Sequence, residues 1–430
     1  MQAYAKYYSK IIEGCNQFII PIYQRNYNWG IEHCRKLLDD ILSISEDDNK
    51  THFIGAIVYY CDSPIRSGLS KLIVIDGQQR LTTISLLVFA AIKFMEDNNY
   101  GTESFRNKLK DTFLYNSNES GEDKYKLVLV REDKVLYYNL LTSAFTDENQ
   151  SHAIIRNFRF FYEQFKKNNI EKICNGIWRL ILVETALDKG DNPQLIFESM
   201  NSTGLDLTQA DLIRNYLLMG RDSKITEELY LKYWLPMESG YAEEYGILFN
   251  RFVRDYLTVK TQSIPKIDRV YEEFKNYAKD LNNDEKILAL VKDIAKFNDY
   301  YCKMVVGGEE ENRLATIFTR LSTLKADVIY PFLLPIYEDY KNKNISLTEF
   351  EEILLLVESY VFRRSVCGIP TNSMNKTFAN LYKNIHKQKY FESIKVLFIL
   401  LRSYQRFPTD SEFQTMLIDK QDFYKFNRNN

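Results

Sequence analysis

Five adjacent residues, Asp76-Gly77-Gln78-Gln79-Arg80, form a polar group that neither a hydrophobic core nor a solvent-exposed face would require. Residues 72–75 before them are a short Leu, Ile and Val run typical of a strand, and from Leu81 the apolar residues recur at helical spacing. A glycine turn from a strand into a helix leaves the first helical N–H groups unpaired, and such an end attracts phosphate. The segment therefore predicts a phosphate-binding turn.

The side chains of this segment suit phosphate chemistry. Arg80 offers a rigid cationic fork for a phosphoryl oxygen, and the Asp76 carboxylate could hold a magnesium ion or activate water. The amides of Gln78 and Gln79 could orient a water molecule, which a glutamine does in GTP hydrolysis. A capped strand-to-helix turn in which Asp76 pairs with Arg80 is the structural alternative, and the spacing leaves both interpretations open.

A second amide and guanidinium pair, Gln24-Arg25, lies in the segment PIYQRNYNW at residues 21–29. Pro21 disfavours a helix there, and the three aromatic rings of the segment either stack on a nucleobase or pack a hydrophobic corner. If the run at residues 17–22 joins a sheet with the runs at 53–61 and 72–75, both pairs reach one side of it. We therefore expect Asp76 and Arg80 to face one polar cavity shared with Gln24 and Arg25.

Composition limits the class of protein. The 430 residues suffice for two or three domains, and 45% hydrophobic with 27% charged residues is ordinary for a globular protein. A formal charge of −2 excludes a chain that is basic overall, so contact with nucleic acid needs a local patch. The six scattered cysteines predict reduced, buried thiols, and without a signal peptide or an apolar run of about 18 residues we predict a cytoplasmic protein.

The remaining pattern predicts an α+β chain in two parts. A hairpin of the runs at 53–61 and 72–75, with further strands at 17–22, 125–130 and 178–187, forms a small mixed sheet. Helices are expected at 31–45, through most of 102–168, from Pro193, and at 209–219, where Thr208 and Asp211 resemble a capping box. Helical periodicity dominates from residue 221, so we predict domains at 1–220 and 221–430, the second all-helical.

Within the second domain, residues 361–407 carry nine Lys or Arg and one acid, Glu392, which gives a local charge of +8 with aromatic rings interleaved. Such a stretch suits the DNA backbone, although solvated helix faces are also rich in lysine. The predicted DNA contacts are Arg363, Arg364, Lys383, Lys387 and Lys389.

Three ordered segments, IPIYQRNYNW, DGQQRLTT and FESMNSTGLDLTQADLIRNYLL, resemble the N-terminal GmrS-like domain of GmrSD-type, modification-dependent type IV restriction enzymes. The resemblance covers residues 1–220 closely. It implies a ParB/sulfiredoxin-like fold whose DGQQR box binds and hydrolyses a nucleoside triphosphate, with magnesium as the expected metal. It assigns catalysis to Asp76, Gln79 and Arg80, and nucleotide contacts to Gln24, Arg25, Gly77, Gln78, Thr82 and Asn201.

One feature of such enzymes is missing from the sequence. Their HNH nuclease domain needs a histidine next to a metal site, and the four histidines here, His33, His52, His152 and His386, are far apart. We therefore expect either a fragment or a nuclease on a separate chain. No Walker-type G-x-x-x-x-G-K-[ST] loop is present, so an NTPase here would be of another type.

Two functions remain open. The chain is either an NTP-hydrolysing module that regulates DNA restriction against phage, or a non-catalytic module that senses nucleotide or DNA and recruits a nuclease. We expect double-stranded DNA and a nucleoside triphosphate as partners.

Overall fold

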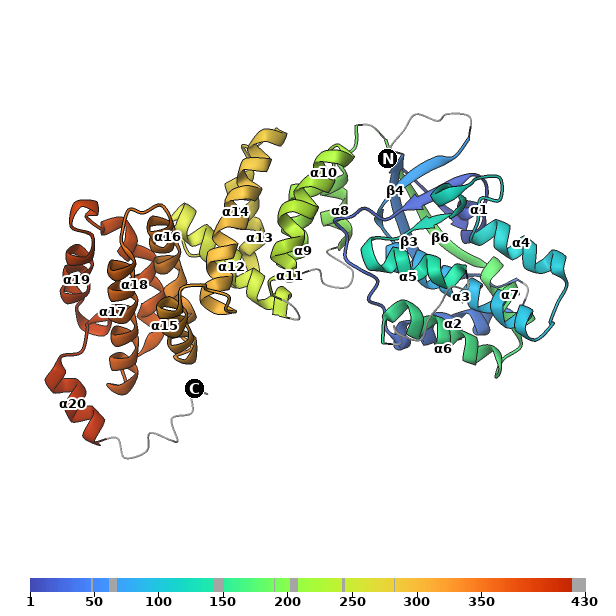
Figure 1. Ribbon diagram of the computed structural model, residues 1–430. Coiled ribbons are helices and arrows are strands. Elements are labelled where there is room, and N and C mark those ends of the chain that lie inside the picture. Colours follow the sequence, from blue (N-terminus) through green and yellow to red (C-terminus); the bar gives the residue numbers. More distant parts are fainter. Residues whose placement is uncertain are drawn as a thin grey trace. The chain divides into compact units, whose positions relative to one another are not determined.

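The structure is a computed structural model that describes every residue except 48, 62–67, 143–150, 189, 202–207, 242–243, 282 and 420–430, and no side chain at 200, 201 or 223. The chain divides into two compact units. The first comprises residues 1–206 and 218–220, and the second comprises 207–217 and 221–430. Figure 1 shows strands and helices in the first and helices in the second.

The first unit contains a six-stranded mixed sheet of order β1-β6-β3-β4-β2-β5. Its strands are β1 (Gln2–Tyr7), β2 (Asn16–Ile19), β3 (His52–Cys61), β4 (Ser70–Asp76), β5 (Leu127–Val128) and β6 (Leu180–Leu187). The β1–β6 and β3–β4 pairs are antiparallel, and the β3–β6, β2–β4 and β2–β5 pairs are parallel. The predicted hairpin of β3 and β4 and the place of β2 in the same sheet are thus confirmed.

Several strands differ in length from the prediction. β2 ends at Ile19, two residues before Pro21, whose nitrogen has no hydrogen to give to a sheet ladder. The run at 125–130 forms only the two-residue β5, and Trp178 ends a helix before β6 begins. β1 was not predicted, because its residues are exposed on both faces and leave no alternating pattern.

The helices of the first unit are α1 (Tyr8–Ile12), α2 (Ile31–Ser45), α3 (Gln78–Asp97), α4 (Glu103–Phe113), α5 (Arg131–Leu141), α6 (Ala153–Phe165), α7 (Ile170–Trp178) and α8 (Pro193–Asn201). Helix α3 is the central one, because every residue from Leu81 to Ile92 is buried. It packs against α4 and α6, while α2 packs against α7 (Figure 1). The core thereby fixes the first turn of α3, where the DGQQR box lies.

A buried lysine helps to hold the N-terminal segment of this unit. The Lys126 ammonium donates to the main-chain oxygens of Ile12 and Gly14 at 3.0 and 2.5 Å and to Asn116 Oδ1 at 3.0 Å. Burial lowers the pKa of Lys126. Its role is therefore to satisfy main-chain oxygens that follow α1.

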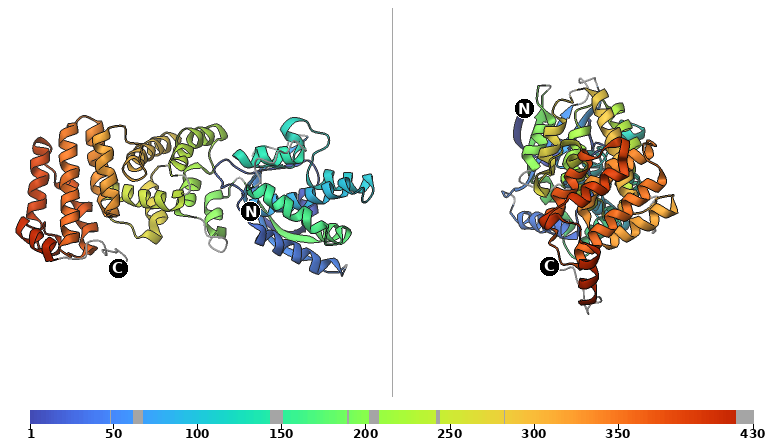
Figure 2. Two further views of the ribbon diagram at one scale, coloured as in Figure 1. Left: turned by 60° about the horizontal axis from the view of Figure 1, so that its bottom comes forward. Right: turned by 90° about the vertical axis from the view of Figure 1, so that its left-hand side faces the viewer.

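The second unit consists of helices in the part of the chain that the structure describes, and they lie side by side in rows (Figure 2). They are α9 (Gln209–Leu218), α10 (Ser223–Leu229), α11 (Leu235–Ser239), α12 (Tyr245–Thr261), α13 (Val270–Ala278), α14 (Asp284–Val305), α15 (Asn312–Thr323), α16 (Tyr330–Lys341), α17 (Leu347–Val366), α18 (Met374–Leu381), α19 (Tyr390–Leu400) and α20 (Asp410–Asp419). Together with the mixed sheet they confirm the predicted α+β fold class.

The cysteines are all free thiols, but they are less buried than expected. Cys34 and Cys174 are buried, whereas Cys15 and Cys61 are exposed. Burial raises the pKa of the Cys34 thiol to about 12, which keeps it protonated.

Candidate functional site

The turn between β4 and α3 has the geometry that the sequence predicts. Gly77 adopts a left-handed conformation with φ of 98° and caps α3 without a side chain. A Cβ on Gly77 would lie 3.1 Å from the Ala56 main-chain oxygen and 3.2 Å from the Ile57 Cα, so β3 approaches the turn closely. The first N–H groups of α3 are therefore left for a ligand or water.

Arg80 lies across the neighbouring strand. It donates to the Ala56 main-chain oxygen at 3.0 Å, and its Nη1 is 3.8 Å from the Asp76 carboxylate. Its guanidinium rests on Gly55, whose φ is 105° at an irregularity of β3; a Cβ there would lie 2.9 Å from Arg80 Nε. Both charged side chains are about one-third exposed, at 33% for Arg80 and 32% for Asp76, so solvent and ligands can reach them.

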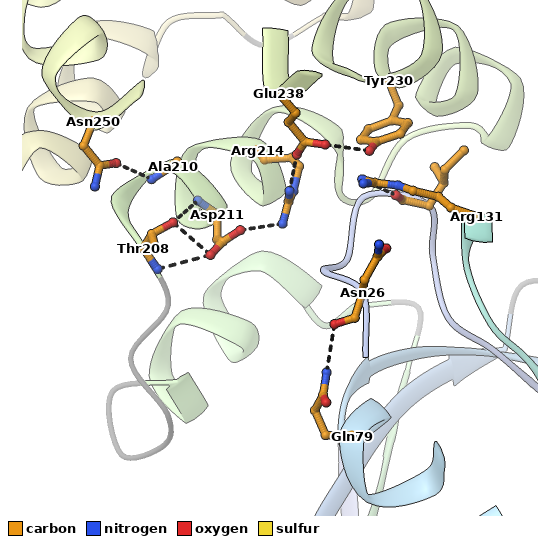
Figure 3. Close-up of polar contacts among 11 residues, drawn as sticks. Asn26, Gln79, Arg131, Thr208, Ala210, Asp211, Arg214, Tyr230, Glu238 and Asn250 are labelled. Atoms are coloured by element: carbon orange, nitrogen blue, oxygen red, sulfur yellow. Dashed lines mark hydrogen bonds and ion pairs between the residues drawn. The ribbon is translucent and has the colours of Figure 1, made fainter. Parts of the chain in front are cut away.

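The two predicted glutamines Gln79 and Gln24 make structural hydrogen bonds. Gln79 Oε1 accepts from the main-chain nitrogens of Asn28 and Trp29 at 3.0 and 3.2 Å, and its Nε2 donates to the Asn26 main-chain oxygen at 3.3 Å (Figure 3). Gln24 Nε2 donates to the Val74 and Ile75 oxygens at 2.8 and 2.9 Å. Both amides are more than nine-tenths buried, so in this conformation they hold the 24–29 loop to α3 and β4.

Three more residues hold the same loop. The Tyr27 hydroxyl is 2.7 Å from Thr83 Oγ1, and the Tyr27 nitrogen donates to the buried Asp133 carboxylate at 2.6 Å. Asn157 Nδ2 donates to the Tyr27 hydroxyl at 2.9 Å and to the Trp29 main-chain oxygen at 2.7 Å. Burial raises the pKa of Asp133. The Tyr27 ring is therefore held at both Thr83 and Asn157, and Tyr27 is a corner residue that packs in the core.

Gln78, Arg25 and Thr82 border a small cavity that Asp133 also lines. Its volume is about 10 Å³, which holds at most one water molecule. Thr82 is 2% exposed and its hydroxyl donates to the Gln78 main-chain oxygen at 2.9 Å. This cavity is too small for a triphosphate in the conformation described.

Arg80 lines a different and larger cavity, of about 400 Å³. Among the cavities that the described residues line, Arg80 and Arg25 border different ones, and one polar cavity shared by Arg80, Gln24 and Arg25 stays a prediction. The Arg80 guanidinium lies across β3 at the irregularity of Gly55, while Gln24 turns towards the main chain of β4. The wall of this larger cavity is formed by Trp29, His33, Lys36, Leu37, Asp40, His52, Phe53, Ile54, Arg80 and Ile84.

Residues 4–218 match the family model described as GmrSD restriction endonuclease, N-terminal domain. The chain belongs to this family. Membership identifies it as a module of a type IV restriction system and so suggests that DNA is involved. A search of curated proteins found no match. No helix among the described residues is long and apolar enough to cross a membrane.

The third motif of the GmrSD N-terminal domain runs through α8 and α9. The Asn201 side chain, predicted to contact nucleotide, lies outside what the structure describes. In α9, Thr208 and Asp211 form the predicted capping box, with the Asp211 nitrogen donating to Thr208 Oγ1 at 3.1 Å (Figure 3). Arg214 is buried and pairs with Asp211 at 2.6 Å and with Glu238, which also accepts from Tyr230 at 2.8 Å. These polar residues of the motif thus hold α9 in the second unit.

Arg364 and Lys387, two of the five predicted DNA contacts of this GmrSD-type chain, are held by groups of the second unit. Arg364 is 1% exposed and donates to the Tyr404 and Pro370 main-chain oxygens, at 2.7 and 2.8 Å, so its assignment to DNA is wrong: the guanidinium satisfies buried main-chain oxygens. Lys387 pairs with Asp339 at 2.5 Å.

The other three predicted contacts differ in exposure, and Arg363 is the least exposed of them. Arg363 pairs with Asp410, whose side chain is 80% exposed, at 2.5 Å. Lys383 and Lys389 are exposed. The basic stretch therefore offers fewer free cations than its sequence suggests.

The four histidines have separate surroundings. His33 stacks on Trp29, His52 Nε2 lies 3.2 Å from Asp40, and His152 Nε2 lies 3.3 Å from Asp133. His386 is exposed. Among the described residues, no group of three or more His, Cys, Asp or Glu side chains is placed to hold a metal ion by itself.

Sequence reasoning missed part of the wall around Arg80. Phe53 and Lys36 were unremarkable members of a strand and a helix, and His52 was noted only as one of four histidines that are far apart in sequence. The irregularity of β3 places Arg80 across the strand that carries His52 and Phe53, and an unexplained glycine inside a β-rich run was the available indication.

Proposed function

We propose that this GmrSD-type chain binds and hydrolyses a nucleoside triphosphate at the Asp76–Arg80 box, and thereby regulates a DNA restriction system. The observation that carries the proposal is Arg80, one-third exposed and held by Ala56 beside the uncapped first turn of α3. A positive fork next to free helical N–H groups is suited to a phosphate chain. The ParB/sulfiredoxin-like character of the unit belongs to the same proposal.

Each residue of the box has a role in the proposed reaction. Arg80 binds the phosphates and stabilises the charge that develops during phosphoryl transfer. Asp76 is the carboxylate that would hold magnesium, which usually binds through one or two carboxylates and the phosphates of the substrate and neutralises charge on the transferred group. Gln78 is the half-buried amide of the pair, and it orients water while Gln79 positions the loop.

The second unit would contact duplex DNA through exposed lysines, of which Lys383 and Lys389 are the best placed. Cutting would fall to an HNH nuclease on a separate chain or domain, because HNH chemistry needs a histidine beside a bound metal. This division assigns the nucleotide switch to the first unit and DNA contact to the second.

A non-catalytic module is the alternative, and one observation favours it. The side-chain amides of Gln24 and Gln79 are hydrogen-bonded to main-chain groups, and Asp76 lies 3.8 Å from Arg80. These side chains therefore already have structural partners. In that case the chain would bind nucleotide without turnover and recruit a nuclease.

Magnesium-dependent phosphate release by the purified 430-residue chain separates the two functions. We expect turnover with at least one of the four nucleoside triphosphates, and a decrease of about a hundredfold or more in Arg80→Ala with little change in Tm. Arg106→Ala is the matched control, because Arg106 also donates to main-chain oxygens, those of Tyr100 and Gly101 at 3.0 and 2.9 Å, but lies on α4. Binding without phosphate release would favour the alternative, and unfolding of Arg80→Ala would make Arg80 a structural residue.

A further inference from the structure

The cavity beside Arg80 has the size and the wall of a ligand pocket. Its volume of about 400 Å³ lies in the range of small-molecule sites, roughly 300–1,000 Å³. Its wall combines aromatic rings, imidazoles and two cations. We call it the Arg80 cavity; the residues used below are Trp29, His33, Lys36, His52, Phe53 and Arg80.

Two aromatic surfaces in this wall are available to a flat ligand. The Trp29 indole stacks on the His33 imidazole with centroids 5.2 Å apart and planes at 13°. Gln79 and Asn157 fix the Trp29 main chain, so the stacked pair is held in place before any ligand arrives. The Phe53 side chain is 60% exposed on β3 and lines the same cavity, so its ring is accessible to a ligand there.

The cations of the Arg80 cavity suit an anionic group. Arg80 is fixed by Ala56 and Gly55, as described above. Lys36 is exposed on α2 and forms no ion pair with any residue that the structure describes. Asp40 is the one carboxylate in the wall, and His52 lies 3.2 Å from it. A ligand with an aromatic ring at one end and several negative charges at the other would satisfy both sets of residues.

We propose that the Arg80 cavity is the nucleotide pocket: the base stacks on Phe53 and on the Trp29–His33 pair, and the phosphates reach Arg80 and Lys36. This inference rests on the proposed function and adds to it the residues that recognise the base. The small cavity beside Arg25 and Gln78 has room for at most one water molecule, so in this proposal it takes the water that Gln78 orients and not the nucleotide.

The test compares a ligand that has a base with one that lacks it. Calorimetry gives the affinities of the full chain for ATP, GTP, CTP, UTP and inorganic tripolyphosphate, in wild type and in Phe53→Ala. We expect Phe53→Ala to weaken the best nucleotide by about tenfold, the effect of one lost stacking contact, and to leave tripolyphosphate unchanged. Tyr404→Ala is the control, because Tyr404 is a 70% exposed ring in the second unit.

If Phe53→Ala loses affinity equally for nucleotide and for tripolyphosphate, the proposed pocket is contradicted, because a distorted fold weakens the binding of both ligands. Unchanged nucleotide affinity in Phe53→Ala would also overturn it, and if that variant still hydrolyses nucleotide with the wild-type KM, the proposed function stands without this pocket. If the wild-type chain binds no nucleotide, both the pocket and the proposed function fail.

Discussion

At the scale of single residues, two adjacent glutamines of identical chemistry have different surroundings. Gln79 is 7% exposed and holds three main-chain groups of the 26–29 loop, whereas Gln78 is half-buried at the rim of the small cavity. A substitution that removes a buried side-chain amide leaves the main-chain groups that it held unsatisfied, at a cost of about 1–3 kcal/mol. The two positions should therefore respond differently to the same substitution.

We predict that Gln79→Ala lowers the free energy of unfolding by about 1–3 kcal/mol, while Gln78→Ala changes it by less than about 0.5 kcal/mol. Urea unfolding followed by circular dichroism measures both. Gln78→Ala should instead slow phosphate release. A stable Gln79→Ala with slow release would show that Gln79 acts in the reaction and not on the loop.

Local patterns predicted the box, and long-range packing decided its surroundings. The Gly77 turn and the start of α3 follow from a few neighbouring residues, so the sequence could predict them. The separation of Arg80 from Arg25 depends on Gly55 and on hydrogen bonds between Gln24 and β4, fifty residues away in sequence. The assignment of Arg364 to DNA failed for a similar reason. A basic residue in a basic stretch gives no indication that its guanidinium will be buried against the main-chain oxygens of Tyr404 and Pro370.

At the scale of elements, the irregularity of β3 places Arg80. Gly55 combines a φ of 105° with the Arg80 guanidinium directly against it. An added methyl group would be strained by the backbone and would also displace Arg80. Gly14 offers a comparison, because its φ is 82° but nothing lies within 4 Å of an added Cβ.

We predict that Gly55→Ala reduces nucleotide turnover by about tenfold or more, because Arg80 moves, and that Gly14→Ala does not. Both variants should lose roughly 1–2 kcal/mol of stability from the left-handed backbone. Steady-state kinetics and urea unfolding measure the two effects. Equal turnover in Gly55→Ala and wild type would mean that the position of Arg80 is not set by β3.

In the second unit, one carboxylate ties α16 to the segment before α19. Asp339 Oδ2 accepts from Tyr382 at 2.9 Å, Lys387 at 2.5 Å and Tyr390 at 2.6 Å. Burial alone would raise the pKa of Asp339, but hydrogen bonds, chiefly from Lys387 and Tyr390, outweigh it and hold the pKa below its usual 3.8. A lowered carboxyl pKa in the folded chain means that the unfolded chain binds the proton first.

The stability from Asp339 should therefore be complete above about pH 4 and should be lost as the pH falls through the lowered pKa. We predict that Asp339→Asn is less stable than wild type at neutral pH and that this difference shrinks in acid. Urea unfolding from about pH 7 to pH 3 measures it. Asp410→Asn is the control, because Asp410 is 80% exposed and its pair with Arg363 should contribute little. A difference that grows in acid would contradict the assignment.

For the whole molecule, the proposed function assigns nucleotide chemistry and DNA contact to different units. Lys383 and Lys389 are exposed in the second unit, whereas Lys387 is needed by Asp339. Replacing Lys383 and Lys389 with Glu should weaken binding to duplex DNA and reduce its salt dependence, with turnover unchanged. The same change at Lys266 and Lys279, exposed lysines outside the basic stretch, is the control. Fluorescence anisotropy at several salt concentrations measures the binding, and equal effects of the two pairs would contradict a specific DNA surface.

In the proposed function, Arg80 binds the phosphates of a nucleotide. Calorimetric titration of the folded Arg80→Ala chain with tripolyphosphate and with the preferred nucleoside triphosphate tests it most directly. We predict that both affinities fall by the same factor, about tenfold or more, because the lost charge contacts only the part that the two ligands share. Wild-type affinity of Arg80→Ala for both ligands would contradict it.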